Sequence, residues 1–159
     1  MSVAVETFYG TDDRPYMTRV SFTDWLVLHV FHRGDEDPDP HDHRRAFVTF
    51  PLRSYVEEVY HHAGWLAGKT TVRVVRAGRP HFRGRVFTHR VLGLWSGERD
   101  RLTGKPLVSV VEGEISTLVC WLGRKRKTWG FWCWPARGLR DRRRFVEWRD
   151  YIDRGIRHG

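Results

Sequence analysis

The chain has 159 residues, of which 40% are hydrophobic and 14% aromatic, so it is too apolar for a disordered protein and long enough for one domain with its own core. Its formal net charge of +9 favours anionic partners, nucleic acids among them, without selecting one. No apolar run is long enough to span a membrane and the first residues do not resemble a secretory signal, so a cytoplasmic location is expected.

The first half of the chain alternates in the manner of β-strands. From Arg19 to Arg33, Val27 and His29 fall on one face of a strand that is predicted to be buried on both sides. A loop rich in Asp and Pro follows from Gly34 to Pro40. A second extended segment runs from Phe47 to Tyr60, with a proline inside it that indicates an edge or a bulge.

The second half continues this pattern and ends in a helix. Further strands are predicted at Thr70–Arg76, Gly84–Trp95, Leu107–Glu114, Ile115–Gly123 and Lys127–Trp134. After Asp141 as a candidate cap, apolar residues recur at spacings of three and four, which is typical of an amphipathic helix; they are Phe145, Trp148, Ile152 and Ile156. The chain is therefore predicted to be all-β, a closed or sandwiched antiparallel sheet within a single domain, residues 1–159, with a C-terminal helix.

Cysteine usage is consistent with a reducing compartment. Cys120 and Cys133 lack the spacing of a zinc or redox motif, and two cysteines are too few for a disulfide scaffold. They flank the predicted hairpin and could face each other across it, but two buried thiols are the favoured interpretation.

The most informative motif is the pair His41 and His43. In an extended chain these two imidazoles lie on one face, where they can bind one metal ion. His89 lies within a later strand and is the favoured third ligand over His81, which follows a proline in a predicted turn. Three imidazoles suit Zn, Fe, Cu or Ni and leave coordination positions open. The competing interpretation is that the pair belongs to an ordinary surface turn.

The motif and its surroundings resemble the cupin superfamily, whose first motif begins with HxH and whose second contributes one further histidine. The stretches LHVFHRGDEDPDPHDHRRAFVTFPLRSYVEEV, HRVLG, STLVCWLGRKRKTWGFWCW and EWRDYI are similar to a group of small bacterial and phage cupin-like proteins, and they cover about Leu28 to Ile152. This resemblance implies a cupin-type antiparallel β-barrel, or jelly roll, and is compatible with a homodimer.

One departure from the cupin pattern bears on the metal. Most cupins place a glutamate roughly four residues after the HxH, where this chain has Arg44, Arg45, Ala46 and Phe47. A three-histidine set without that glutamate is similar to the site of thiol dioxygenases of the cysteine dioxygenase type, which use non-haem ferrous iron and dioxygen. The resemblance thus implies a divalent transition metal, Fe(II) first, with Zn, Ni or Mn as alternatives.

A small-molecule substrate is expected in the barrel interior. Arg53 and Tyr55 share the predicted face of the HxH pair, as does Glu57, while Arg90 and Trp129 could bind an anionic or planar group. The alternative is a module without catalytic activity that binds a small ligand, or a nucleic acid through the basic runs at 124–127 and 137–144. Solvated turns explain these runs equally well. A metal-dependent isomerase or hydrolase is a third, weaker interpretation.

Overall fold

The computed structural model describes residues 3–9, 13–35, 39–125, 128–133 and 143–153, and in these ranges it is almost entirely antiparallel β-structure. The strands are β1 (Ala4–Tyr9), β2 (Pro15–Ser21), β3 (Leu26–Phe31), β4 (Ala46–Pro51), β5 (Tyr55–Tyr60), β6 (Thr70–Val75), β7 (His81–Arg83), β8 (Thr88–Trp95), β9 (Val110–Val111), β10 (Ile115–Leu122), β11 (Gly130–Cys133) and β12 (Arg144–Glu147), and the helix is α1 (Trp148–Asp153). The prediction of an all-β fold of jelly-roll type with a C-terminal helix is confirmed.

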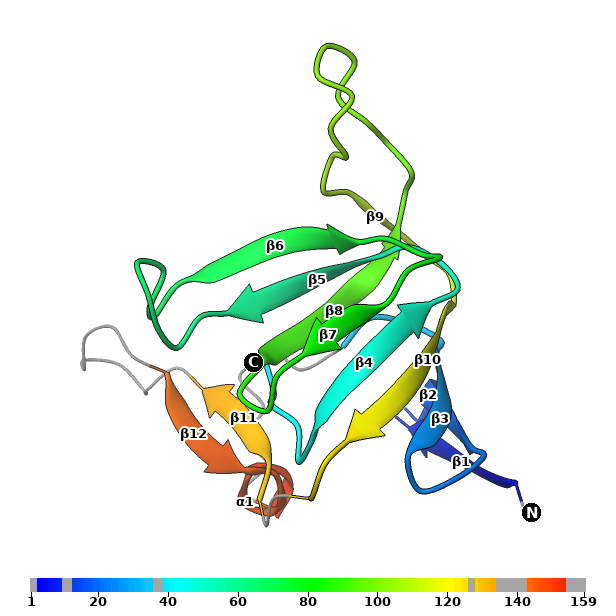
Figure 1. Cartoon of the computed structure of the whole chain (residues 1–159), viewed down its shortest axis with the longest axis vertical. Coiled ribbons are helices and arrows are strands. Elements are labelled where there is room, and N and C mark those ends of the chain that lie inside the picture. The colour runs from blue at the N-terminus through cyan, green and yellow to red at the C-terminus, as the bar shows by residue number, and fades with distance from the viewer. Residues whose placement is uncertain (1–2, 10–12, 36–38, 126–127, 134–142, 154–159) are drawn as a thin grey trace.

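Two sheets form the body of the molecule (Figure 1). The larger has the strand order β1-β2-β3-β10-β4-β7 and the smaller the order β6-β5-β8-β9. Tyr55, Val91 and Leu94 of the smaller sheet pack with Ile115 and Phe31 of the larger in one buried cluster. Because both sheets contribute to this cluster, apolar burial holds their inner faces together.

A second apolar layer lies further along the same inner face. Val27, Phe47 and Val119 are buried on the larger sheet, with Trp121 and Phe87 packed against them. Facing residues of β3, β10 and β4 are in register, so that Val119 lies between Val27 and Thr49. This layer is the one that supports the histidine motif described below.

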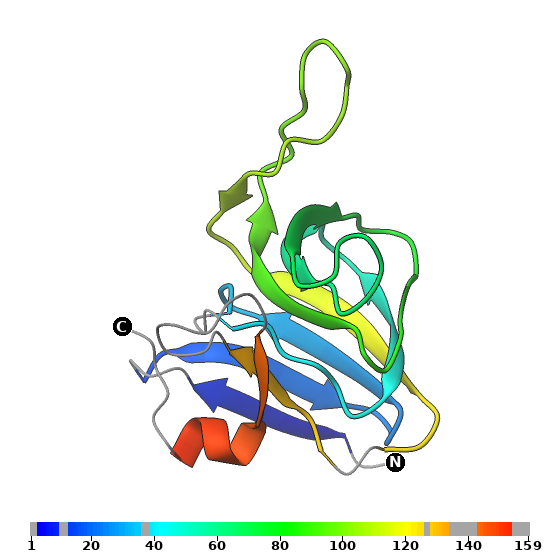
Figure 2. The same cartoon turned by 90° about the vertical axis from the view of Figure 1, so that its left-hand side faces the viewer.

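Between β8 and β10 the chain forms an arm that projects from the body (Figures 1 and 2). The arm is closed by a bridge between Arg99 and Pro106, and Leu102 near its tip is 96% exposed. The predicted strand Leu107–Glu114 is paired only at Val110–Val111.

Three predicted segments were wrong in their extent. The strand Arg19–Arg33 is two strands, because Thr23 Oγ1 accepts a hydrogen bond from the Leu26 amide, at 3.0 Å, and closes a turn. The segment Phe47–Tyr60 is divided between the two sheets after Pro51. The strand predicted at Gly84–Trp95 begins only at Thr88.

The C-terminal helix also begins later than predicted. Phe145 lies in β12, paired with Trp132 and with its ring 5.7 Å from that indole, so strand pairing with β11 overrides the helical spacing. The helix starts at Trp148; the predicted cap Asp141 and Ile156 lie outside the described residues. No helix in the described part of the chain is long and apolar enough to cross a membrane. Cys120 and Cys133 are both free thiols.

The pairing of β11 with β12 requires a glycine at position 130. A Cβ atom there would lie 2.0 Å from the Val146 carbonyl oxygen, so Gly130→Ala should force the two strands apart. We expect a loss of about 2–3 kcal/mol in the free energy of unfolding, seen as a fall in Tm of roughly 5–10 °C by calorimetry. Gly84→Ala is the control, since a Cβ there meets no atom within 4 Å. An equal Tm in the two variants would contradict the prediction.

Candidate metal centre

His41 and His43 lie in a short extended segment before β4 that is held on both sides. The His41 amide donates to the His89 carbonyl at 2.9 Å, and the His89 amide donates to the His41 carbonyl at 3.0 Å. Next to it, the Asp42 amide donates to the Gly130 carbonyl and the Asp42 carboxylate accepts from the Gly130 amide, each at 3.0 Å. The segment is therefore a bridge between β8 and β11, and its extended backbone turns both imidazoles to one side.

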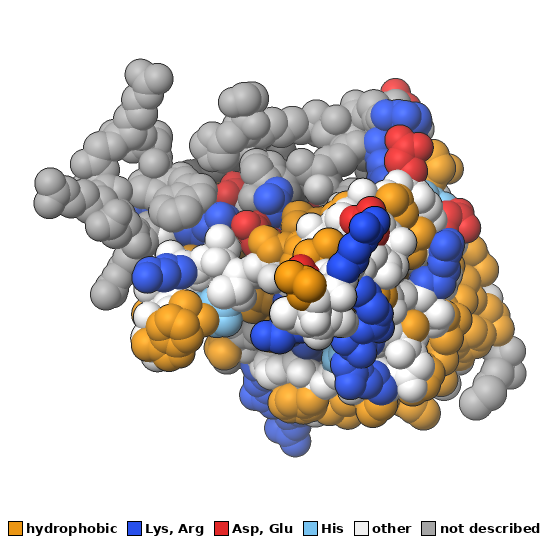
Figure 3. Space-filling view, turned by 90° about the horizontal axis from the view of Figure 1, so that it is seen from above, with side chains coloured by type: hydrophobic (Ala, Val, Ile, Leu, Met, Phe, Trp, Pro, Cys, Tyr) orange, Lys and Arg blue, Asp and Glu red, His pale blue; other side chains and the backbone are white. Residues whose placement is uncertain are grey.

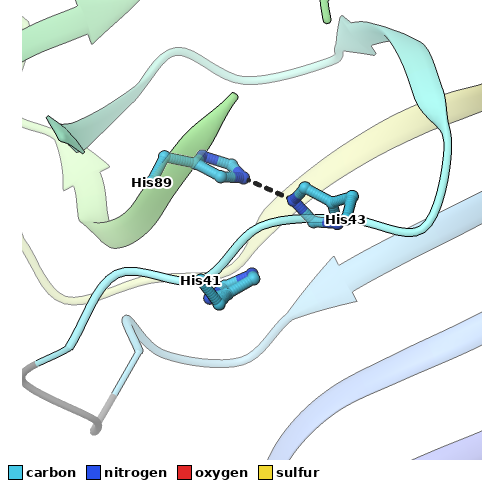
Figure 4. A group of neighbouring side chains, drawn as sticks. All are labelled: His41, His43 and His89. Atoms are coloured by element: carbon cyan, nitrogen blue, oxygen red, sulfur yellow. Dashed lines mark hydrogen bonds between the residues drawn. The ribbon is translucent and has the colours of Figure 1, made fainter. Parts of the chain in front are cut away.

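The three imidazoles His41, His43 and His89 converge on one point (Figure 4). One ring nitrogen of each lies within 4.8 Å of the others. The ring centroids are 5.0, 5.4 and 5.1 Å apart, a nearly equilateral arrangement. His43 Nε2 and His89 Nε2 are 2.9 Å apart, so one of the two carries the proton between them. Once that proton is displaced, three ring nitrogens grouped in this way are a suitable donor set for a transition metal.

Aromatic rings surround this cluster. Phe47 lies 4.5 Å from the His43 ring and Phe87 lies 5.0 Å from the His89 ring, measured between centroids. Burial is the main cause that lowers the pKa of His41 to about 4; the charge of Asp35 opposes this shift and the charge of His89 adds to it. Burial and the neighbouring imidazoles also hold the pKa of His43 well below its usual value. Both rings are therefore neutral at neutral pH, which is the state that binds a metal.

Glu57 on β5 fixes the orientation of His89. Its carboxylate oxygen Oε2 accepts a hydrogen bond from His89 Nδ1 at 2.9 Å, and Oε1 accepts from Arg73 Nε at 2.8 Å and Arg83 Nη2 at 2.9 Å. The side chain is fully buried. Burial alone would raise the pKa of Glu57, but the hydrogen bond and charge of His89 and the charges of the two arginines lower it to about 2. With the carboxylate accepting from Nδ1–H, Nε2 is the ring nitrogen of His89 that faces the cluster.

Of the four other residues predicted to contact substrate, two lie near the cluster or in the barrel interior and two do not. Trp129 lies 6.2 Å from the His41 ring, and Tyr55 is buried in the barrel interior. Arg90 is paired with Glu58 at 2.7 Å on the opposite face of β8 from His89, and exposed Arg53 donates to the Glu114 carbonyl. The structure does not bring Arg53 or Arg90 to the imidazole cluster. His81 lies in β7 and not in a turn, and its Nε2 is bonded to the Arg76 carbonyl.

Sequence reasoning did not find the roles of Glu57 and Arg83. Glu57 was expected only to line the cavity, and its contact with His89 depends on the β5–β8 register, which shifts between Val56 and Glu57. Arg83 had no motif to mark it. The signal that was available is the position of Glu57 between Tyr55 and Val59 on one face of an extended segment, because a buried carboxylate requires partners.

An open groove of about 690 Å³ lies elsewhere on the molecule, at the base of the arm. None of the cluster histidines lines it, and one basic side chain there, His32, is bonded to Glu114 at 2.7 Å. The groove lacks the convergent buried ligands of the imidazole cluster, so we place the candidate site at the cluster.

No protein-family description and no curated protein matches the sequence. Solved structures do resemble it, and two of these are cupins. An RmlC-like cupin protein from Ralstonia eutropha is 12% identical, with a TM-score of 0.47 over 96% of this chain and 78% of that one. A cupin 2 conserved barrel domain protein from Rhodopseudomonas palustris is 16% identical, with a TM-score of 0.43 over 95% and 82%.

The structure of Fe(II) HppE is 10% identical, with a TM-score of 0.47, and the match covers 76% of this chain and 56% of that one. The chain thus spans just over half of the length of HppE. Each of these likenesses concerns the fold alone.

The hydrogen bond between Glu57 and His89 should set the metal affinity of the cluster. Glu57→Gln keeps the shape but loses the charge that fixes the His89 tautomer, so we expect Zn(II) or Co(II) to bind about 10- to 100-fold more weakly, measured by competition with a chromophoric chelator. Glu58→Gln is the matched control, because Glu58 pairs with Arg90 on the other face of the sheet. Equal affinities in the two variants would exclude this role for Glu57.

Proposed function

We propose that the protein is a metal-dependent enzyme of the cupin type, with His41, His43 and His89 as ligands, and that it is a non-haem iron oxygenase or dioxygenase acting on a small molecule. The observation that carries the proposal is the convergence of three imidazole nitrogens within 4.8 Å, one of them oriented by a buried carboxylate. A bound transition metal would supply Lewis acidity and, as Fe(II), reactivity toward dioxygen.

The chain's own residues suit this role in several ways. The three donors are all imidazole nitrogens, which favours Fe, Zn or Ni over Mg or Ca. Glu57, Arg83 and Arg73 hold His89 in one tautomer. No carboxylate joins the described cluster as a fourth ligand, which leaves room for substrate and dioxygen together.

The protein environment would also restrict what reaches the metal. Phe47, Phe87 and Trp121 enclose the cluster on the barrel side, and Trp129 and Phe131 lie beside His41. Apolar walls exclude water and strengthen every polar contact made inside them. We therefore place a small substrate in the barrel interior, with Trp129 at its entrance and Tyr55 further inside.

Metal content is the first test of this function. The wild-type protein should hold close to one equivalent of transition metal after anaerobic loading with Fe(II), measured by elemental analysis. His43→Ala and His89→Ala should each lower this to about a tenth or less, because two imidazoles remain of three. His81→Ala is the control and should retain full metal, since His81 bonds the Arg76 carbonyl instead. Full metal content in all the variants would place the metal elsewhere.

Oxygen consumption separates an oxygenase from the other metal enzymes. Fe(II)-loaded protein should consume dioxygen faster when its substrate is present in a panel of small organic acids, thiols and alcohols, measured with an oxygen electrode. The Zn(II)-loaded protein should not, because zinc has no redox chemistry. Turnover by both metals without oxygen uptake would favour an isomerase or hydrolase. A protein that binds no metal would favour the binding module.

The Lys and Arg side chains on the surface bear on a different question, whether the protein binds nucleic acid. Seen from above, Lys and Arg side chains stand in several groups between apolar ones (Figure 3). Residues 126–127 and 137–142 of the two basic runs lie outside the described residues. A nucleic-acid partner therefore stays a prediction, and its affinity would have to fall steeply with salt.

A further inference from the structure

Among the eight buried side-chain atoms of the described residues that lack a hydrogen-bond partner, two lie on the neighbouring strands β4 and β7. They are Thr49 Oγ1 on β4 and Arg83 Nε on β7, and both residues are 4% exposed. A buried donor or hydroxyl without a partner is costly, and native proteins almost always satisfy such groups with protein, water or ligand. Two of them on adjacent strands therefore indicate a bound polar group.

The register of the larger sheet places these two residues near each other and near the candidate metal centre. Arg83 is paired with Phe47, and Thr49 is the next residue along β4 on the same inward face. Thr49 and Arg83 are diagonal neighbours, a spacing that a long side chain can cross. The ring of Phe47 lies 4.5 Å from the ring of His43, measured between centroids. Thr49 is two residues further along β4, which is about 7 Å along the strand from Phe47.

The surrounding charges favour an anion. The guanidinium groups of Arg83 and Arg73 share a single carboxylate, that of Glu57, so positive charge exceeds negative around it; the side chain of Arg83 is 5% exposed and that of Arg73 is 46% exposed. Arg83 is fixed further by the ring of Phe87, 4.5 Å below its guanidinium carbon. Its Nε–H can only donate, and the Thr49 hydroxyl can donate beside it, so the missing partner is an acceptor oxygen.

We propose that Thr49 and Arg83 bind the carboxylate of a short organic acid whose other end reaches the imidazole cluster. The two donors fit two acceptor oxygens, and charge-assisted bonds of this kind are stronger than neutral ones. The inference deepens the proposed function, because it names the substrate class of the same site. Because Thr49 lies roughly 7 Å along β4 from Phe47, the acid must have several bonds between its carboxylate and the group that reaches the metal.

Thr49→Val is the main test, with Thr117→Val as the matched control. Thr117 is also a buried, inward-facing threonine, 3% exposed, but its hydroxyl already donates to the Leu118 carbonyl at 3.3 Å. Zn(II)-loaded wild type and variants are titrated with straight-chain monocarboxylates of three to six carbons and with the matching amides, followed by ligand-observed NMR. The metal content of each sample is measured in parallel.

We expect the best acid to bind wild type at least tenfold more tightly than its amide, and to bind Thr49→Val at least tenfold more weakly than wild type. Thr117→Val should stay within about twofold of wild type. Without ligand, Thr49→Val should have a Tm about 2–6 °C higher, because a methyl replaces an unsatisfied hydroxyl. These results with metal retained would support the proposal.

Other outcomes overturn it. Acid binding that is unchanged in Thr49→Val but lost in His43→Ala would mean that the carboxylate binds the metal directly. No acid binding together with a lower Tm for Thr49→Val would mean that a buried water alone occupies the position. A protein that holds no metal but still loses acid binding on Thr49→Val would refute the proposed function and leave this site standing, so the two failures are distinguishable.

Discussion

The candidate site depends on one backbone interaction, the reciprocal pair of hydrogen bonds between His41 and His89. Residues that exchange both bonds in an antiparallel pair have their side chains on the same face. The pair of hydrogen bonds therefore brings the HxH segment and β8 together so that the faces carrying the imidazoles turn inward. A slip of one residue would replace His89 with Arg90, whose side chain points to the opposite face and bonds Glu58. The register of a single bridge thus decides whether three imidazoles meet.

Buried charge is the second constraint on the architecture. A fully buried glutamate is tolerable at position 57 only because three groups donate to it, and two of them carry permanent positive charge. Arg83 is in turn held between Glu57 and the face of Phe87. The ion pair between Arg83 and Glu57 crosses from β7 to β5, so a contact that helps to position His89 also ties the larger sheet to the smaller one. The same charged cluster around Glu57 therefore stabilises the fold and positions the site.

Much of the site could be predicted from the sequence because strand alternation is local. The HxH pair needs only period two, and the predicted strand Ile115–Gly123 differs by one residue from β10. What could not be predicted depends on partners distant in sequence. Phe145 fits a helical stripe, yet its pairing with Trp132 places it in a strand. The contact between Glu57 and His89 depends on a register shift in the β5–β8 pair, and no periodicity reveals a bulge.

The carboxylate nearest to the imidazole cluster is placed differently from that of most cupins. In the usual cupin pattern a glutamate shortly after the HxH is a ligand, whereas here Phe47 occupies that neighbourhood and packs edge-to-face against His43. The only described carboxylate in contact with the cluster is Glu57, which touches His89 at Nδ1 and is already shared by two guanidinium groups. Three neutral imidazoles would leave the charge of a divalent ion uncompensated. Because low dielectric makes such an excess costly, the proposed function is best served by a substrate that brings the compensating anion, and the proposed carboxylate site at Arg83 and Thr49 would receive it.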